Sequence, residues 1–140
     1  MDLDALETSF DLVAPKGDEL VEIFYARLFE TAPAVQPLFA SADMTHQRTM
    51  LLSALVLLRK SLRDVDSIVP ALKRMGARHV GYGAAPAHYP VVGEVLIDSM
   101  AEIAGPAWEP RFERAWGEAF AVVAGAMLEG AAEAEFALAA

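Results

Sequence analysis

The sequence predicts an all-α domain with helices of unequal length, on three observations. Alanine is abundant, and β-branched residues are sparse apart from the valines, which favours helix over strand. No segment alternates apolar and polar residues over the length of a strand. Apolar residues instead recur at every third or fourth position in six segments, which prolines and glycines separate.

Helix signals are clear in the first third of the chain. The first helix is predicted over residues 3–13, before a proline and a glycine interrupt its pattern. The second begins with Asp18 as its predicted N-cap and ends near Ala32, because Pro33 follows. Between Pro33 and Pro37 we expect one tight turn.

The middle of the chain predicts two further helices. A polar loop precedes the third helix, for which Asp43 or Thr45 is the predicted N-cap. Its apolar face continues to Leu62. The fourth helix begins at Asp66 or Ser67, tolerates a proline in its first turn, and ends where two glycines occur.

Two helices are predicted in the last third. The fifth opens near Pro90 and ends at Gly105, which a proline follows. The sixth opens near Pro110, and its apolar stripe continues to Met127. A symmetric four-helix bundle would have longer and more equal segments, so we expect an irregular arrangement.

The composition excludes several classes of protein. The chain has 140 residues, which fit one domain, and its eleven basic and twenty acidic residues give a net charge of −9. This charge argues against nucleic acids and anionic membranes as partners. The absence of cysteine excludes disulfides, iron–sulfur clusters and thiolate ligation of haem. Because the apolar runs are too short for a membrane span and the acidic N-terminus is unlike a secretory signal, we expect a cytoplasmic protein.

His79 continues the apolar face of the predicted fourth helix. Ile68, Leu72, Met75 and His79 lie at positions i, i+4, i+7 and i+11. On a helix they fall within an arc of about 60°. An imidazole directed into a core needs a partner for each ring nitrogen. The ordinary interpretation is a buried histidine bonded to a backbone carbonyl, and the alternative is a metal or haem ligand.

Other metal sites are less compatible with the pattern. His46, His79 and His88 do not lie three or four residues apart, and no H-E-x-x-H segment is present, so a zinc site is disfavoured. A di-iron site would need paired E-x-x-H segments, which are absent. A single histidine on an apolar face suits haem, where burial of the porphyrin supplies most of the affinity.

Five blocks of sequence resemble a known family in order and spacing. They are FYARLF at residues 24–29, PLF at 37–39, RH at 78–79, AHYPVVG at 87–93 and AWG at 115–117. Together they resemble the single-domain bacterial haemoglobins and the globin domain of flavohaemoglobins, over about residues 5–128. The resemblance implies a globin fold, with six to eight helices around one haem b, as a single domain over residues 1–140 without a reductase domain.

The resemblance also implies roles for individual residues. His79 corresponds to the proximal iron ligand, and Tyr25 to the family's distal tyrosine. The distal helix of the family usually offers a glutamine to the bound gas, and counting back from His79 gives Gln47, with Leu51 one turn further on. His46 is the alternative, since a shift of one residue rotates the helix by about 100°.

Further residues are implied on both sides of the haem. The residues that correspond to the family's packing positions around the haem pocket are Phe24, Phe39, Val92 and Trp116. On the proximal side Tyr89 matches the family tyrosine, and Arg78 is a candidate contact for a haem propionate. The family's proximal glutamate has no counterpart, because the expected position holds Ala131. This departure argues against strong electron donation to the iron, since hydrogen-bond partners tune a ligand's basicity.

Several functions follow from the resemblance. The protein would bind dioxygen reversibly, and also nitric oxide and carbon monoxide, at a pentacoordinate iron. It would also convert nitric oxide to nitrate, as a dioxygenase, if an external reductase supplied electrons. The alternatives are a haem-based redox or oxygen-sensing module, and a helical regulatory domain without haem.

Overall fold

The computed structural model describes residues 1–139, with side chains described up to residue 137. It contains six α-helices and no strand over the described part of the chain, which confirms the predicted fold class. The helices are α1 (Leu3–Val13), α2 (Gly17–Thr31), α3 (Met44–Lys60), α4 (Val69–Gly81), α5 (His88–Ala104) and α6 (Pro110–Ala139). Short 3-10 segments are η1 (Ala14–Lys16), η2 (Pro33–Phe39), η3 (Val65–Ile68) and η4 (Gly105–Ala107).

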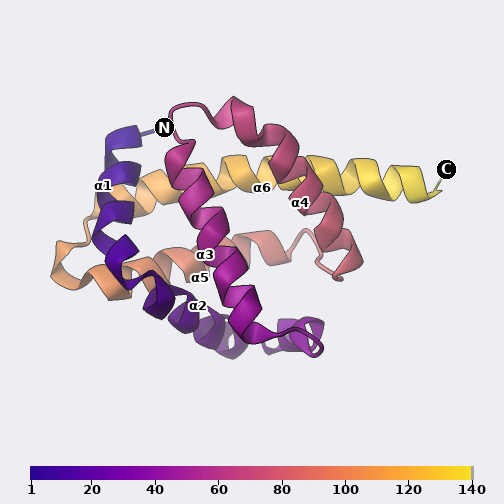
Figure 1. Ribbon diagram of the computed structural model, residues 1–140, viewed down its shortest axis with the longest axis horizontal. Coiled ribbons are helices and arrows are strands. Elements are labelled where there is room, and N and C mark those ends of the chain that lie inside the picture. The colour runs from indigo at the N-terminus through magenta and orange to yellow at the C-terminus, as the bar shows by residue number, and fades with distance from the viewer. Residues whose placement is uncertain (140) are drawn as a thin grey trace.

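The helices form two layers (Figure 1). Helices α5 and α6 lie at the back of the view, and α3 and α4 cross in front of them. Helix α2 packs on α5, while α4 packs chiefly on α6. The last turns of α6 extend beyond the rest of the molecule.

A side chain caps the start of α3, whereas none caps the start of α2. Asp43 is the N-cap of α3, because its carboxylate accepts hydrogen bonds from the backbone N–H groups of Thr45 and His46. The prediction that Asp18 caps the second helix is wrong, since α2 begins at Gly17. The segment η1 leads directly into α2, so Asp18 lies in the first helical turn. There its negative charge interacts favourably with the positive end of the helix dipole.

One predicted turn and the predicted start of the fourth helix at Asp66 or Ser67 differ from the structure. Residues 33–39 form the 3-10 segment η2 rather than one tight turn. Residues 65–68 form η3, so that α4 begins at Val69, with Pro70 in its first turn. Helix α5 begins at His88, near Pro90 as predicted, and Pro90 fits the first turn because the N–H that it lacks would have no partner within the helix there. Gly105 ends α5 as predicted, with a φ of +58° that favours glycine.

The core lies between α1, α2, α5 and α6. Its largest fully buried side chains include Trp116, Phe112, Leu6 and Met100. The indole Nε1 of Trp116 donates a hydrogen bond of 2.8 Å to the hydroxyl of Ser9, which is also fully buried. This bond satisfies the one polar atom that the tryptophan brings into the core.

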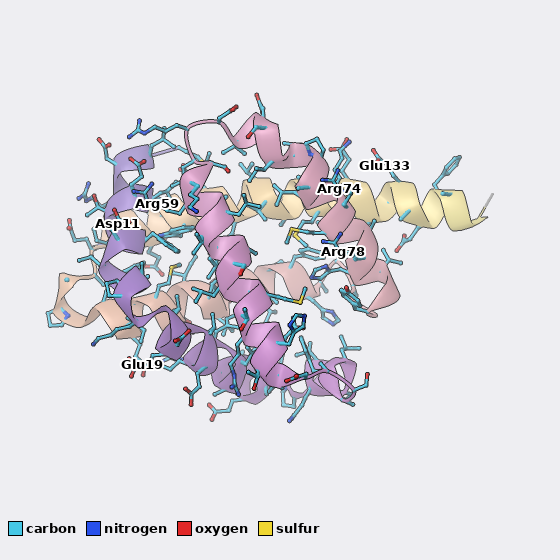
Figure 2. All side chains as sticks on the ribbon, viewed as in Figure 1. Asp11, Glu19, Arg59, Arg74, Arg78 and Glu133 are labelled. Carbon is cyan, nitrogen blue, oxygen red and sulfur yellow. The ribbon has the colours of Figure 1, made fainter. Side chains whose placement is uncertain are left out.

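Ion pairs at the surface link α1 to the end of α3 and to the residues that follow it. Arg59 bonds the carboxylates of Glu7 and Asp11, and Arg63 bonds those of Glu7 and Asp4. Figure 2 shows Arg59 and Asp11 pointing toward one another. Over the described residues, none of the helices combines the length and the apolar character that crossing a membrane requires.

Candidate functional site

An apolar cavity lies between α3, α4, α5 and α6. Its volume is about 230 Å³. The lining consists of aliphatic and aromatic side chains, small residues and two histidines: Leu51, Ala54, Leu55, Leu57, Leu58, Ile68, Leu72, Met75, His79, Ala84, His88, Tyr89, Val92, Gly93, Leu96, Phe120, Val123, Ala124 and Met127. Leu57 lines the cavity and is also 42% exposed, so it marks the opening to solvent.

His79 is held in a defined orientation in the last turn of α4. Its Nδ1 lies 2.6 Å from the backbone carbonyl oxygen of Met75, one turn earlier, and donates to it. The donation places the ring proton on Nδ1, so Nε2 carries the lone pair. Over the described residues Nε2 has no hydrogen-bond partner, and the half-buried side chain lines the cavity.

This geometry combines the two interpretations that the sequence allowed for His79. A backbone carbonyl does satisfy one ring nitrogen, as in an ordinary buried histidine. The other nitrogen remains available as a ligand at an apolar surface. The same bond that satisfies the ring also fixes its tautomer and its orientation, which is how metal-ligating histidines are commonly held.

No glutamate of α6 contacts His79 in the described part of the chain. Glu129 and Glu133 both pair with Lys73 of α4, each at 3.1 Å. These bonds raise the pKa of the Lys73 ammonium, with the bond to Glu129 as the larger cause. The polar partner of His79 is therefore a neutral carbonyl rather than a carboxylate.

Two residues at the start of α5 complete the wall beside His79. Tyr89 lines the cavity, and burial raises the pKa of its phenol. His88 also lines the cavity, although the sequence analysis gave it no role. Its Nδ1 accepts a hydrogen bond of 3.0 Å from the backbone N–H of Ala85, which holds the ring at the first residue of the helix.

A second group of side chains joins α2, η2 and the start of α3. The amide Nε2 of Gln47 donates to the phenol oxygen of Tyr25 at 3.2 Å. The ring of Tyr25 meets Phe39 edge-on at 5.7 Å between centroids, and Phe39 meets Phe29 at 5.4 Å. Burial raises the pKa of the Tyr25 phenol, while the bond from Gln47 and the charge of Arg48 oppose the increase. Tyr25 is therefore a protonated hydrogen-bond donor at neutral pH.

Helix α3 directs Gln47 and His46 differently. Gln47 is half-buried and reaches Tyr25, whereas His46 is exposed. Leu51, one turn after Gln47, lines the cavity, and so the Gln47 face of α3 is the face that borders it. This placement corresponds to the register with Gln47 inward.

Five residues expected in the pocket do not line the cavity, namely Phe24, Tyr25, Phe39, Gln47 and Trp116. Trp116 is fully buried in the core, and its ring lies 5.2 Å between centroids from that of Phe120, which lines the cavity. Val92 and Leu51 do line it. Arg78 is exposed on α4, as Figure 2 shows.

Many lining residues were not predicted as site residues, although the sequence held a signal for them. Met75, Leu96, Val123 and Met127 belong to the apolar stripes of their helices. A stripe indicates burial but does not distinguish a cavity wall from a filled core.

The residues present fit a haem group. The cavity offers an apolar surface and one imidazole with a free nitrogen, and no cluster of three or more metal-ligating side chains exists among the described residues. Haem needs this combination, because one axial ligand and burial of the porphyrin suffice to hold it. The volume of 230 Å³ lies below the about 300–1,000 Å³ usual for small-molecule sites, so side chains at the opening would move outward to admit haem.

The fold and the cavity define an all-α protein with one histidine directed at an apolar pocket. A family model described as Globin matches residues 22–127. The chain belongs to the globin family, and membership implies a haem cofactor.

Curated relatives extend this result. The flavohemoprotein of Bacillus subtilis is 27% identical over 128 residues, which are 90% of this chain and 32% of that protein. The flavohemoprotein of Vibrio cholerae is 27% identical over 123 residues, which are 84% of this chain and 30% of that protein. The chain therefore spans about a third of the length of the curated relatives it matches.

Solved structures show the same architecture. An engineered carbene transferase, based on a proposed nitric oxide dioxygenase of Rhodothermus marinus, superposes with a TM-score of 0.88 and 26% identity, over 99% of this chain and 96% of that one. A bacterial globin from Campylobacter jejuni gives a TM-score of 0.81 with 20% identity, over 94% of each chain. The second similarity concerns the fold alone.

Proposed function

We propose that the protein binds haem b through Nε2 of His79 and binds dioxygen reversibly on the opposite face of the haem. The observation that carries the proposal is the free Nε2 at an apolar cavity, with Nδ1 already bonded to the Met75 carbonyl. Haem held there by His79 would supply the iron to which diatomic gases bind.

Other residues would donate a hydrogen bond to the gas ligand or exclude water from the site. Tyr25 lies outside the cavity lining, but its phenol oxygen accepts from Gln47, so its own hydrogen is free to donate to a gas ligand that comes within reach. In a pocket of low dielectric constant such a bond to an anionic acceptor is stronger than in water. Leu51 and Val92 present apolar surface that excludes water from the site.

We also propose that the haem-loaded protein uses dioxygen as the oxidant to convert nitric oxide to nitrate, both oxygen atoms of dioxygen ending in the nitrate, and that an external reductase then supplies the one electron that restores the ferrous state. The support is the similarity to flavohemoproteins and to a structure based on a proposed nitric oxide dioxygenase. The 140 residues show no glycine-rich dinucleotide motif after a strand. Electrons would therefore come from another protein or from another segment.

The absorption spectrum of purified protein tests both proposals. Ferrous protein should show a Soret band that shifts reversibly with dioxygen. After mixing with nitric oxide, dioxygen-equilibrated protein should convert to the ferric form once, with about one nitrate per haem. Absence of a Soret band after reconstitution would refute haem binding. Continuous nitrate production from NADH without a reductase would refute the need for an external electron donor.

A further inference from the structure

Helices α4 and α6 touch through their backbones at two glycines. A Cβ atom added to Gly76 of α4 would overlap the backbone carbonyl of Met127. A Cβ added to Gly130 of α6 would overlap the backbone carbonyl of Lys73. Both glycines are buried, and α4 crosses in front of α6 in Figure 1. No residue with a side chain fits either position unless the helices separate.

Lys73 links the two helices by ion pairs beside this contact. Its ammonium pairs with Glu129 and Glu133, the residues one before and three after Gly130. The backbone contact and the ion pairs therefore meet at one point of the crossing. Because these side chains are substantially exposed, the ion pairs contribute little free energy of unfolding and chiefly select the alignment.

The crossing is directly connected to His79. The carbonyl that accepts from Nδ1 belongs to Met75, the neighbour of Gly76, and His79 follows Gly76 by about one turn. Met127, whose backbone meets Gly76, lines the cavity with His79. A displacement of the backbone at Gly76 would therefore move both the imidazole and the wall beside it.

We propose that the crossing at Gly76 and Gly130 positions His79 and so sets the place of its axial nitrogen relative to the haem iron. Gly76 and Gly130 are positioning residues, and Lys73 keeps their register. This inference rests on the proposed haem ligation by His79.

The chain contains matched controls on the same two helices. A Cβ at Gly81 of α4 or at Gly125 of α6 would meet no atom within 4 Å. Gly81→Ala and Gly125→Ala therefore make the same chemical change without pressing the helices apart. Replacing glycine by alanine within a helix is otherwise neutral or favourable.

The experiment compares Gly76→Ala and Gly130→Ala with these controls in haem-reconstituted full-length protein. The readouts are the iron–histidine stretching band of the ferrous protein in resonance Raman spectra and the rate of haem transfer to an acceptor protein. Crossing variants should shift the band and lose haem about 10- to 100-fold faster, as changes beside a metal ligand commonly do. Controls should match the parent in both measurements.

Lys73→Gln keeps the test decisive if a crossing variant does not fold, because Lys73 lies at the surface. It should shift the same band by a smaller amount, and Lys73→Arg should restore the parental band. Parental bands and haem-loss rates in the folded crossing variants and in Lys73→Gln would overturn the inference. A parent that takes up no haem, or shows no iron–histidine band, would instead refute the proposed function.

Discussion

The amide of Gln47 donates to the phenol oxygen of Tyr25 at 3.2 Å, and this bond between residues 22 positions apart joins α3 to α2. The phenol hydrogen is left free by this arrangement, because the oxygen acts as the acceptor. Helix α3 at the same time directs His46 into solvent. We therefore expect Tyr25 to be the main donor to a gas ligand and Gln47 to be the second.

Tyr25→Phe should increase the rate of dioxygen release. A hydrogen bond to a charged acceptor contributes about 1.5–3 kcal/mol, which corresponds to a factor of roughly 10 to 150. Gln47→Leu should have a smaller effect, and His46→Leu should have none, since His46 is exposed. Stopped-flow release rates measure the three effects, and carbon monoxide, a poorer acceptor, is the control ligand. A larger effect of His46→Leu than of Gln47→Leu would contradict this arrangement.

The dioxygen release rate should be independent of pH from about pH 6 to about pH 9. Burial raises the pKa of the Tyr25 phenol above its ordinary value of 10.0, so the donor keeps its proton throughout this range. Release should become faster only above pH 10, as the phenol ionises and can no longer donate. Tyr25→Phe should show a flat and faster profile. A step in the parental profile near neutral pH would assign the donor to another group.

His79→Ala should abolish tight retention of haem, because the proposed axial ligand is lost. His88→Ala is the matched control, since His88 lines the same cavity but its Nδ1 is occupied by the backbone N–H of Ala85. Haem content after gel filtration measures retention, and added imidazole should partly restore it in His79→Ala. Full haem content and an unchanged ferrous spectrum in His79→Ala would show that the ligand is a different residue.

Ser9→Ala should lower the free energy of unfolding by about 1–3 kcal/mol, because the buried Nε1 of Trp116 loses its acceptor. Ser99→Ala provides the comparison. Ser99 is equally buried, but its hydroxyl bonds only the carbonyl of Val95 in its own helix at 2.7 Å. Urea unfolding of both variants gives the difference, and equal losses of stability would argue against a special role of the Ser9–Trp116 bond.

Much of the fold was predictable because its signals are local. Six helices occur where apolar residues recur every third or fourth position, and the predicted break at Gly105 is confirmed. The N-cap at Asp43 was also identified from residue type. Asp18 was not a cap, because a 3-10 segment continues directly into its helix.

The candidate site was predictable in its residue types but not in its contacts. The sequence alone determined that His79 continues an apolar face, since that depends only on helical periodicity. It left open whether Gln47 or His46 faces inward, which the packing of α3 against α2 decides. It also left open the partners of Glu129 and Glu133. Lys73 binds both because Gly76 and Gly130 let α4 and α6 meet backbone to backbone, a contact between distant segments that no local pattern encodes.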